Sequence, residues 1–396
     1  MKLCWLIPSD RSGGISPVAL SCCQQAAKAG FETTMLLLAT PSKIDLENNF
    51  RVDSLGLYGS APEAPAALLQ WLKENPQDVL FFNACGEFDV IIPYVTPNTK
   101  CVYVVHDTAP QYWQTALKEE ENLEAIVAVS ETVAIQFRDR LQQPEKLSVI
   151  YNGCVFPEQS QLNNLRQDEL VFLGGDNPTK GAFDVLKLWK QLVKLGFAGK
   201  LHWFGHVTPE FRAKIDKIPH SNRICVYGHV SRDRVFSVAA SAKVLLMLSR
   251  VEPFGMATIE AMSMGCVPIA WDINTGTKEI VTASKTGLFV PLGKMRALAA
   301  QVMYACEHYQ TFYSAVIERA HSNFNAAVMW KGYESLIHQV STLQAIERSK
   351  KGQQPTAYQP PIRRFQGIPP RIRLAIREFI GRSPYLGYWL RDLRGW

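Results

Sequence analysis

Residues 244–260 have the sequence VLLMLSRVEPFGMATIE, and this stretch decides the fold. It opens with five consecutive apolar residues, turns at Pro253 and Gly255, and continues from Ala257 with a helical pattern. So short an apolar run predicts a strand covered on both faces, as in parallel sheets. The stretch therefore predicts a strand, a loop and a helix of a βαβ unit. Glu252 lies in the loop, and Glu260 lies eight residues further on, inside the helix.

The same strand and helix pattern recurs on both sides of this stretch. The predicted strands of a first series are 3–7, 33–38, 79–82, 101–105, 125–129 and 147–151, and those of a second series are 170–173, 200–204, 224–227, 244–248, 267–271 and 288–290. A polar segment between the two series predicts a linker. We therefore predict two doubly wound α/β domains that face a central cleft. Ligands of such domains bind beyond the carboxyl ends of the strands.

We therefore divide the chain into five parts. These are an N-terminal Rossmann-like domain (1–156), a linker (157–168), a C-terminal Rossmann-like domain (169–322), a C-terminal helix (323–345) and a basic amphipathic tail (346–396).

Composition excludes several classes of protein. With 47% hydrophobic and 20% charged residues among 396, the chain is neither disordered nor fibrous. The net charge of +6 is concentrated in residues 347–396, where 11 Lys and Arg face 3 Asp and Glu, so the tail carries +8 and the remainder −2. A nearly neutral body does not indicate a nucleic-acid partner.

The sequence favours a cytoplasmic protein. Only five apolar residues precede Pro8, which is too short for a signal-peptide core. No apolar run approaches the roughly 18 residues of a membrane span. The nine cysteines form no C-x-x-C pair, which favours reduced thiols.

Two further loops follow predicted strands and precede helices. Ser12-Gly13-Gly14 after the first strand is compatible equally with a tight turn and with a phosphate contact. Gly174 to Gly181 contains Lys180, which is either a phosphate ligand or a solvated lysine. The loop is not a Walker motif, and neither glycine loop reads G-x-G-x-x-G, which argues against a dinucleotide-binding dehydrogenase.

Together these motifs resemble the retaining glycosyltransferases of family 4, which have the two-domain GT-B fold. Glu252 to Gly265 is similar to the family's E-x7-E signature, and Phe172 to Gly181 is similar to its phosphate loop. Weaker motifs occur in the family's order, namely Gly13-Gly14, Val104-Val105-His106-Asp107, Ala128-Val129-Ser130, Ile150-Tyr151-Asn152-Gly153, Val230-Ser231, Asp272 with Glu279, and Gly287 to Pro291.

The resemblance implies that residues 1–156 form the acceptor side and residues 169–322 bind a nucleotide-sugar donor. It implies catalytic roles for three residues: Glu252 at the donor sugar, His106 near the transferred sugar and Lys180 at the diphosphate. The other implied donor contacts are Gly14 at the diphosphate, Val230 and Ser231 near the base, Glu260 at the ribose, and the amides of Phe254, Gly255 and Met256 at donor and phosphate. His106 has an alternative role as a hydrogen-bonded structural group.

One position departs from the family pattern. Gly175 stands where the family usually has an arginine, so half of the expected phosphate clamp is missing. Arg11 and Arg250 are candidate substitutes. The chain has no D-x-D motif, and the resemblance implies neither a metal nor another cofactor. His202 and His206 flank a predicted strand end and do not share a helical face, so we do not predict a metal site there.

The resulting prediction is an enzyme that transfers a hexose from a nucleotide sugar to a carbohydrate or lipid-linked acceptor. A GT-B epimerase or phosphorylase is one alternative, although the E-x7-E signature favours transfer. A non-catalytic nucleotide-sugar-binding subunit is the other alternative, and Gly175 is its best support.

The tail predicts a membrane contact. Residues 369–381 have a helical pattern with one apolar face, and residues 382–396 repeat its mixture of arginine and aromatic residues. Such segments are typical of peripheral helices on anionic membranes. Packing of the apolar face on the enzyme body or on a second subunit is equally compatible with this pattern.

Overall fold

A computed structural model describes residues 1–10, 13–41, 49–58, 61–157 and 166–359, together with residues 372, 375, 376 and 379. Most of the predicted linker and tail lie outside these residues. The chain folds into two compact units. Unit 1 comprises Met1–Val155 and Phe324–Ile362, and unit 2 is built on Phe156–Asn323.

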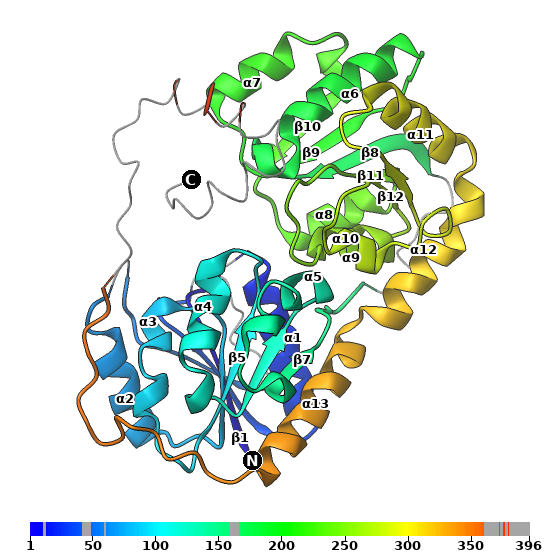
Figure 1. Cartoon of the computed structure of the whole chain (residues 1–396). Coiled ribbons are helices and arrows are strands. Elements are labelled where there is room, and N and C mark those ends of the chain that lie inside the picture. Colours follow the sequence, from blue (N-terminus) through cyan, green and yellow to red (C-terminus); the bar gives the residue numbers. More distant parts are fainter. Residues whose placement is uncertain are drawn as a thin grey trace. The chain divides into compact units, whose positions relative to one another are not determined.

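Unit 1 contains a seven-stranded parallel sheet in the order β3-β2-β1-β4-β5-β6-β7 (Figure 1). Its strands are β1 (Lys2–Ile7), β2 (Glu32–Leu37), β3 (Arg51–Ser54), β4 (Val79–Phe82), β5 (Lys100–Val105), β6 (Ala125–Ala128) and β7 (Leu147–Val149). Its helices are α1 (Ile15–Lys28), α2 (Ala64–Glu74), α3 (Gly86–Asp89), α4 (Pro110–Lys118), α5 (Glu131–Ala134) and α13 (Ala326–Thr342). The strands β4, β5 and β6 are buried along their whole length, and all their residues except Lys100 are apolar, as expected for strands covered on both faces.

Unit 2 contains a six-stranded parallel sheet in the order β10-β9-β8-β11-β12-β13. Its strands are β8 (Gln167–Leu173), β9 (Leu201–Phe204), β10 (Ile224–Gly228), β11 (Ala242–Met247), β12 (Val267–Trp271) and β13 (Leu288–Val290). Its helices are α6 (Ala182–Lys194), α7 (Pro209–Asp216), α8 (Arg232–Ala239), α9 (Met256–Ser263), α10 (Thr277–Ile280), α11 (Met295–Glu307) and α12 (Tyr309–Asn323).

Helix α13 returns the chain to unit 1, where it packs beside α1 (Figure 1). The Tyr333 ring meets the ring of Phe81 on β4 edge-on at 5.9 Å, and the Trp330 ring meets Phe31 at 5.8 Å. Phe81 in turn stacks on Trp5 of β1 at 4.3 Å. These buried aromatic contacts explain why the helix belongs to unit 1.

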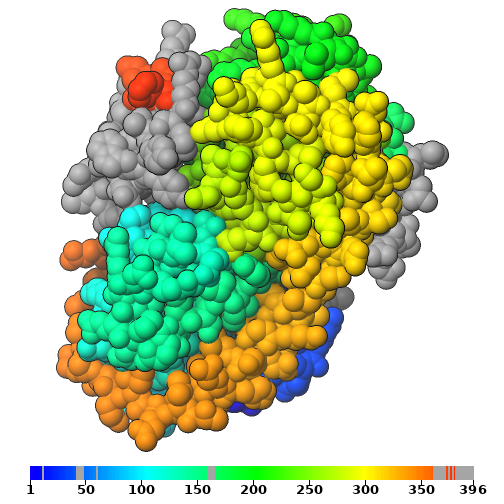
Figure 2. All heavy atoms as spheres, turned by 45° about the vertical axis from the view of Figure 1, so that its right-hand side comes forward, coloured from blue at the N-terminus to red at the C-terminus, as the bar shows by residue number. Residues whose placement is uncertain are grey.

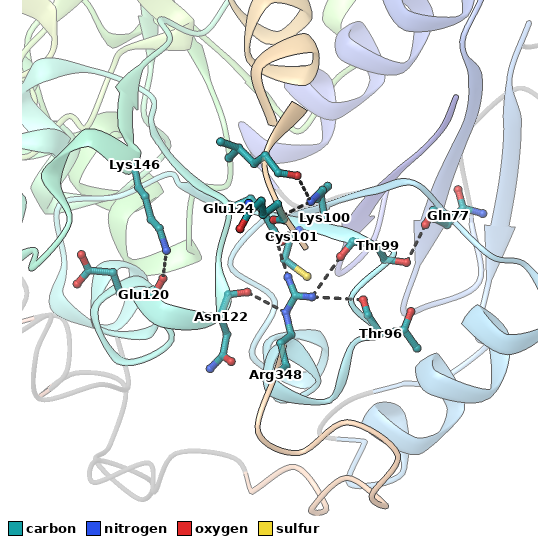
Figure 3. A network of polar contacts seen from close by, with 12 residues as sticks. Gln77, Thr96, Thr99, Lys100, Cys101, Glu120, Asn122, Glu124, Lys146 and Arg348 are labelled. Atoms are coloured by element: carbon teal, nitrogen blue, oxygen red, sulfur yellow. Dashed lines mark hydrogen bonds and ion pairs between the residues drawn. The ribbon is translucent and has the colours of Figure 1, made fainter. Parts of the chain in front are cut away.

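Residues 343–359, which we call the strap, continue from α13 across unit 1. Figure 2 shows α13 and the strap (orange) covering one face of this unit. Arg348 inserts beneath the amino ends of β5 and β6, where its guanidinium pairs with Glu124 at 2.7 Å and both side chains are 0% exposed (Figure 3). Arg348 also donates to the carbonyls of Asn122, Thr96 and Thr99.

Two further contacts fix the ends of the strap. At its start, Lys100 Nζ donates to the carbonyls of Leu343 and Gln344 at 2.8 and 3.1 Å. Near its end, the Tyr358 amide donates to the Pro62 carbonyl at 3.0 Å, and the Tyr358 ring packs over Gly86 at the start of α3. The strap therefore runs from the amino ends of the strands to the side where β4 leads into α3.

No helix among the described residues is long and apolar enough to cross a membrane.

Candidate functional site

Two loops of unit 2 lie together because they follow the paired strands β8 and β11. The Arg250 amide donates to the Thr179 carbonyl at 2.7 Å, which joins the loops through their backbones. Gly181 has φ +90°, and a Cβ at this position would collide with the Leu248 carbonyl. Only glycine allows this close approach, which brings Lys180 beside the loop after β11.

Lys180 and Glu252 form an ion pair at the meeting point of these loops. Lys180 Nζ lies 2.7 Å from Glu252 Oε2, and the Ser249 hydroxyl donates to the same oxygen at 3.0 Å. The Glu252 side chain is 9% exposed, whereas the Lys180 side chain is 36% exposed. The lysine is therefore accessible to an anion, while the carboxylate is fixed beneath it.

Helix α9 begins four residues after Glu252, at Met256, and has no side-chain cap. Gly255 occupies the N-cap position, and Met256 is the first helical residue. The Glu252 carbonyl accepts from the Gly276 amide at 2.7 Å, and the Phe254 side chain is buried, so the loop is fixed from both sides. The amides of a first helical turn have no partner within the helix, and the helix dipole makes this end attractive to an anion.

Glu260, inside α9, pairs with Arg232 at the start of α8. Arg232 Nε donates to Glu260 Oε1 at 2.8 Å. Burial raises the pKa of Glu260, and the nearby guanidinium opposes this rise. The preceding Ser231 accepts a hydrogen bond from the Arg234 amide and caps α8, and Val230 packs against the core of unit 2. Sequence reasoning missed Arg232, because no local pattern relates it to Glu260.

The backbone conformation at position 175 requires a glycine. It has φ +53°, and a Cβ there would collide with the His206 carbonyl from the loop after β9. An arginine does not fit this position without moving that loop.

Arg250 does not take the place of the missing arginine. Its buried guanidinium pairs with Asp184 of α6 and donates to the Leu248 carbonyl. It thus fixes the loop after β11 to α6. Arg11, the other candidate, lies outside the described residues.

His202 is a structural residue. Its ring nitrogens contact Glu169 Oε2 and the Tyr227 hydroxyl, both at 2.9 Å, across three neighbouring strands. In the described parts of the chain, no three His, Cys, Asp or Glu side chains are grouped so that they could hold a metal ion. The expectation that no metal is needed stays a prediction.

The candidate residues of unit 1 lie at the carboxyl ends of its strands. Gly14 is the N-cap of α1, and no side chain caps the start of this helix. His106 directly follows β5, and its Nε2 lies 2.9 Å from Asn83 Oδ1, which follows β4. Burial lowers the pKa of His106 to about 4. The imidazole is therefore neutral near pH 7.

Two Rossmann-like domains with these loops at their carboxyl ends define a GT-B α/β protein. Residues 157–322 match the family described as Glycosyl transferases group 1, and residues 12–155 match the family described as Glycosyltransferase Family 4. The chain is a glycosyltransferase of the GT-B type.

Solved structures agree with the fold. The chain superimposes on the Anabaena protein HepE in complex with UDP and glucose with a TM-score of 0.70, at 18% identity over 87% of this chain and 100% of that chain. Sucrose-phosphate synthase from Thermosynechococcus elongatus gives a TM-score of 0.71 at 18% identity, over 86% of this chain and 99% of that chain.

A curated relative adds a sequence match. The chain is 26% identical over 190 residues to the GDP-mannose:cellobiosyl-diphosphopolyprenol alpha-mannosyltransferase of Xanthomonas oryzae pv. oryzae, which is 46% of this chain and 49% of the relative. The protein of the same name in Xanthomonas campestris matches to a similar extent. The chain thus spans about half the length of the curated relatives it matches.

Proposed function

We propose that the protein is a retaining, metal-independent hexosyltransferase of family 4, which moves a sugar from a nucleoside-diphosphate sugar to a carbohydrate or lipid-linked acceptor. The observation that carries the proposal is the Lys180–Glu252 pair, with its 2.7 Å contact, beside the uncapped start of α9. A cation and a helix N-terminus suit a diphosphate, and carboxylates suit sugar hydroxyls.

The residues of unit 2 then have distinct roles. Lys180 exchanges its contact with Glu252 for the diphosphate, which frees Glu252 to accept hydrogen bonds from the donor sugar. The bond between sugar C1 and the diphosphate oxygen breaks, and its electron pair stays on that oxygen, where Lys180 and the first amides of α9 stabilise the charge. The acceptor hydroxyl oxygen bonds to C1 on the same face, and its proton passes to the departing diphosphate.

A lipid-linked acceptor is the version of the proposal that the tail favours. The names of the two Xanthomonas relatives include a diphosphopolyprenol-linked acceptor. The strap is fixed to unit 1 by Arg348, and its end at Tyr358 packs over Gly86, just beyond the carboxyl end of β4. The strap ends at that side of unit 1, and the arginine-rich residues 369–396 follow it in the sequence, which suits an acceptor presented at the cytoplasmic face of a membrane.

The test is hydrolysis of a panel of nucleotide sugars, including GDP-mannose and UDP-glucose, without acceptor. We expect slow release of one sugar, with NMR detecting first the anomer that the donor carried. Binding of a nucleotide sugar without any turnover would instead support a non-catalytic subunit, and a changed sugar still attached to the nucleotide would support an epimerase.

Metal independence is tested in the same assay. We expect turnover to survive EDTA, because Lys180 and the α9 amides supply the positive charge for the leaving group. Turnover that stops in EDTA and returns with Mn²⁺ or Mg²⁺ would contradict this part of the proposal.

A further inference from the structure

Asn83 and His106 form a side-chain pair at the carboxyl ends of β4 and β5. Asn83 is 3% exposed, and His106 is only partly buried. Asn83 Nδ2 donates to the carbonyls of Leu6 and Phe81, at 3.2 and 3.0 Å. Asn83 Oδ1 lies 2.9 Å from His106 Nε2.

The two backbone carbonyls fix the orientation of the Asn83 amide. An amide nitrogen has two hydrogens and no lone pair to offer, whereas the amide oxygen only accepts. If the amide were turned over, its oxygen would face the carbonyl oxygens of Leu6 and Phe81. Both hydrogens are thus used on these carbonyls, and the oxygen faces His106.

This orientation determines which imidazole nitrogen of His106 carries the hydrogen. Because Asn83 Oδ1 can only accept, the 2.9 Å contact requires a hydrogen on His106 Nε2. A neutral imidazole with that hydrogen carries its lone pair on Nδ1. Among the described residues, no hydrogen bond reaches this nitrogen.

We propose that Asn83 is a positioning residue that holds His106 in the Nε2–H tautomer, so that Nδ1 accepts a hydrogen bond from a hydroxyl of the sugar substrate. The proposal rests on the proposed function for the identity of the ligand. Its statement about the tautomer stands on the hydrogen bonds alone.

The proposal specifies the chemistry that unit 1 recognises. A lone pair on Nδ1 attracts a hydroxyl donor, whereas it repels the oxygens of a carboxylate or a phosphate. His106 in this state therefore selects a neutral sugar hydroxyl. It does not bind the diphosphate, and it disfavours a uronic acid carboxylate at the same place.

The first test is NMR of the full chain labelled with ¹⁵N-histidine, with the His106 signals assigned by their loss in His106→Gln. At pH 7 we expect a protonated Nε2 and an unprotonated Nδ1. A protonated Nδ1 or a fully protonated ring at pH 7 in the wild type would overturn the proposal.

Two asparagine variants separate positioning from general structure. We expect Asn83→Ala to give a mixture of both tautomers, because the acceptor at Nε2 is gone. Asn152→Ala, at a buried asparagine elsewhere in unit 1, should leave the His106 spectrum unchanged. An unchanged tautomer in folded Asn83→Ala would overturn the role of Asn83, and if that variant does not fold, the wild-type spectrum still decides the tautomer.

The second test compares two replacements of His106 in acceptor-free hydrolysis of the nucleotide sugar that the wild type cleaves fastest. An asparagine amide lies as many bonds from Cβ as Nδ1 does, whereas a glutamine amide matches Nε2. We expect His106→Gln to lose about tenfold in kcat/KM through the missing acceptor, and His106→Asn to retain more activity. The opposite order would overturn the Nδ1 contact. If no nucleotide sugar is cleaved at all, the proposed function fails while the NMR result stands.

Discussion

At the scale of single residues, Lys180 and Glu252 carry the proposed activity. We predict that Lys180→Ala and Glu252→Ala each lower acceptor-free hydrolysis by ~100-fold or more. A preorganised contact to the leaving group, as proposed for Lys180, or to the reacting sugar, as proposed for Glu252, contributes about 3 kcal/mol in the transition state. Both variants should stay folded, because Lys180 is partly exposed and the backbone contacts between the loops remain. Initial rates and circular dichroism check the two statements.

The matched controls are Lys217→Ala and Glu210→Ala, two exposed residues in and beside α7 of the same unit. Wild-type rates in all four variants would refute the assignment of the site.

Gly175 gives a second prediction at this scale. Gly175→Arg restores the family's usual residue, yet we expect it to lower the melting temperature and not to raise donor hydrolysis. A positive φ costs an ordinary residue about 1–2 kcal/mol, and the Cβ also collides with the His206 carbonyl.

Gly196→Arg separates the two costs, because Gly196 has φ +82° with nothing within 4 Å of a Cβ. The melting temperature should fall further for Gly175→Arg than for Gly196→Arg. Equal losses would show that crowding by His206 contributes nothing.

At the scale of elements, hydrophobic runs predicted the sheets well. All twelve predicted strands are confirmed to within a few residues, since each is a short, mostly apolar run in a parallel sheet. Only β7 and β10, the strands at two of the sheet edges, are mostly of intermediate burial. The strand β3 was missed because Arg51–Ser54 is mostly polar and lies at the edge of its sheet, where burial no longer determines the sequence. The path of the strap was also unpredicted, because it depends on contacts such as Arg348–Glu124 that join distant residues.

The strap gives the prediction that belongs to this scale. We expect Arg348→Ala to destabilise the protein by about 3–5 kcal/mol, because it leaves the fully buried Glu124 carboxylate without its cation. Urea unfolding followed by circular dichroism measures the loss.

Lys351→Ala is the control, since its ion pair with Glu347 is exposed and such pairs contribute about 0–1 kcal/mol. The double variant Arg348→Met/Glu124→Leu should recover much of the lost stability, because no charge then stays buried alone. If Arg348→Ala is as stable as Lys351→Ala, this account of the strap is contradicted.

At the scale of the whole molecule, the sequence suggested candidate loops but not how their side chains pair. Glu252, Lys180 and Glu260 became candidate site residues through their position after strands and through family resemblance, and their roles stay predictions. Their partners were not, because Arg232 is brought to Glu260, and Asn83 to His106, only by the packing of neighbouring elements. The ion pair between Arg250 and Asp184 was not predicted either, because no sequence pattern relates this loop arginine to an aspartate of α6.

The tail gives the last prediction, which concerns how the whole enzyme reaches its acceptor. Ile372, Ala375, Ile376 and Phe379 are helical and spaced for one face, while the rest of the predicted tail helix lies outside the described residues. Ile372 and Phe379 are 52% and 64% exposed, which leaves apolar surface for a partner. Each arginine near an anionic leaflet contributes about 1 kcal/mol, so several act together.

We therefore expect the intact protein to sediment with phosphatidylserine-containing liposomes and to be released at high salt, where the attraction of the arginines is screened. A protein that ends at residue 359 keeps the strap contacts of Arg348 and Tyr358, so it should stay folded and remain in the supernatant. Neutral phosphatidylcholine liposomes serve as the lipid control. Equal sedimentation of the intact and shortened proteins would exclude the tail as the membrane contact. A shortened protein that loses dimers in ultracentrifugation, with no liposome binding by either form, would instead assign the apolar face to a second subunit.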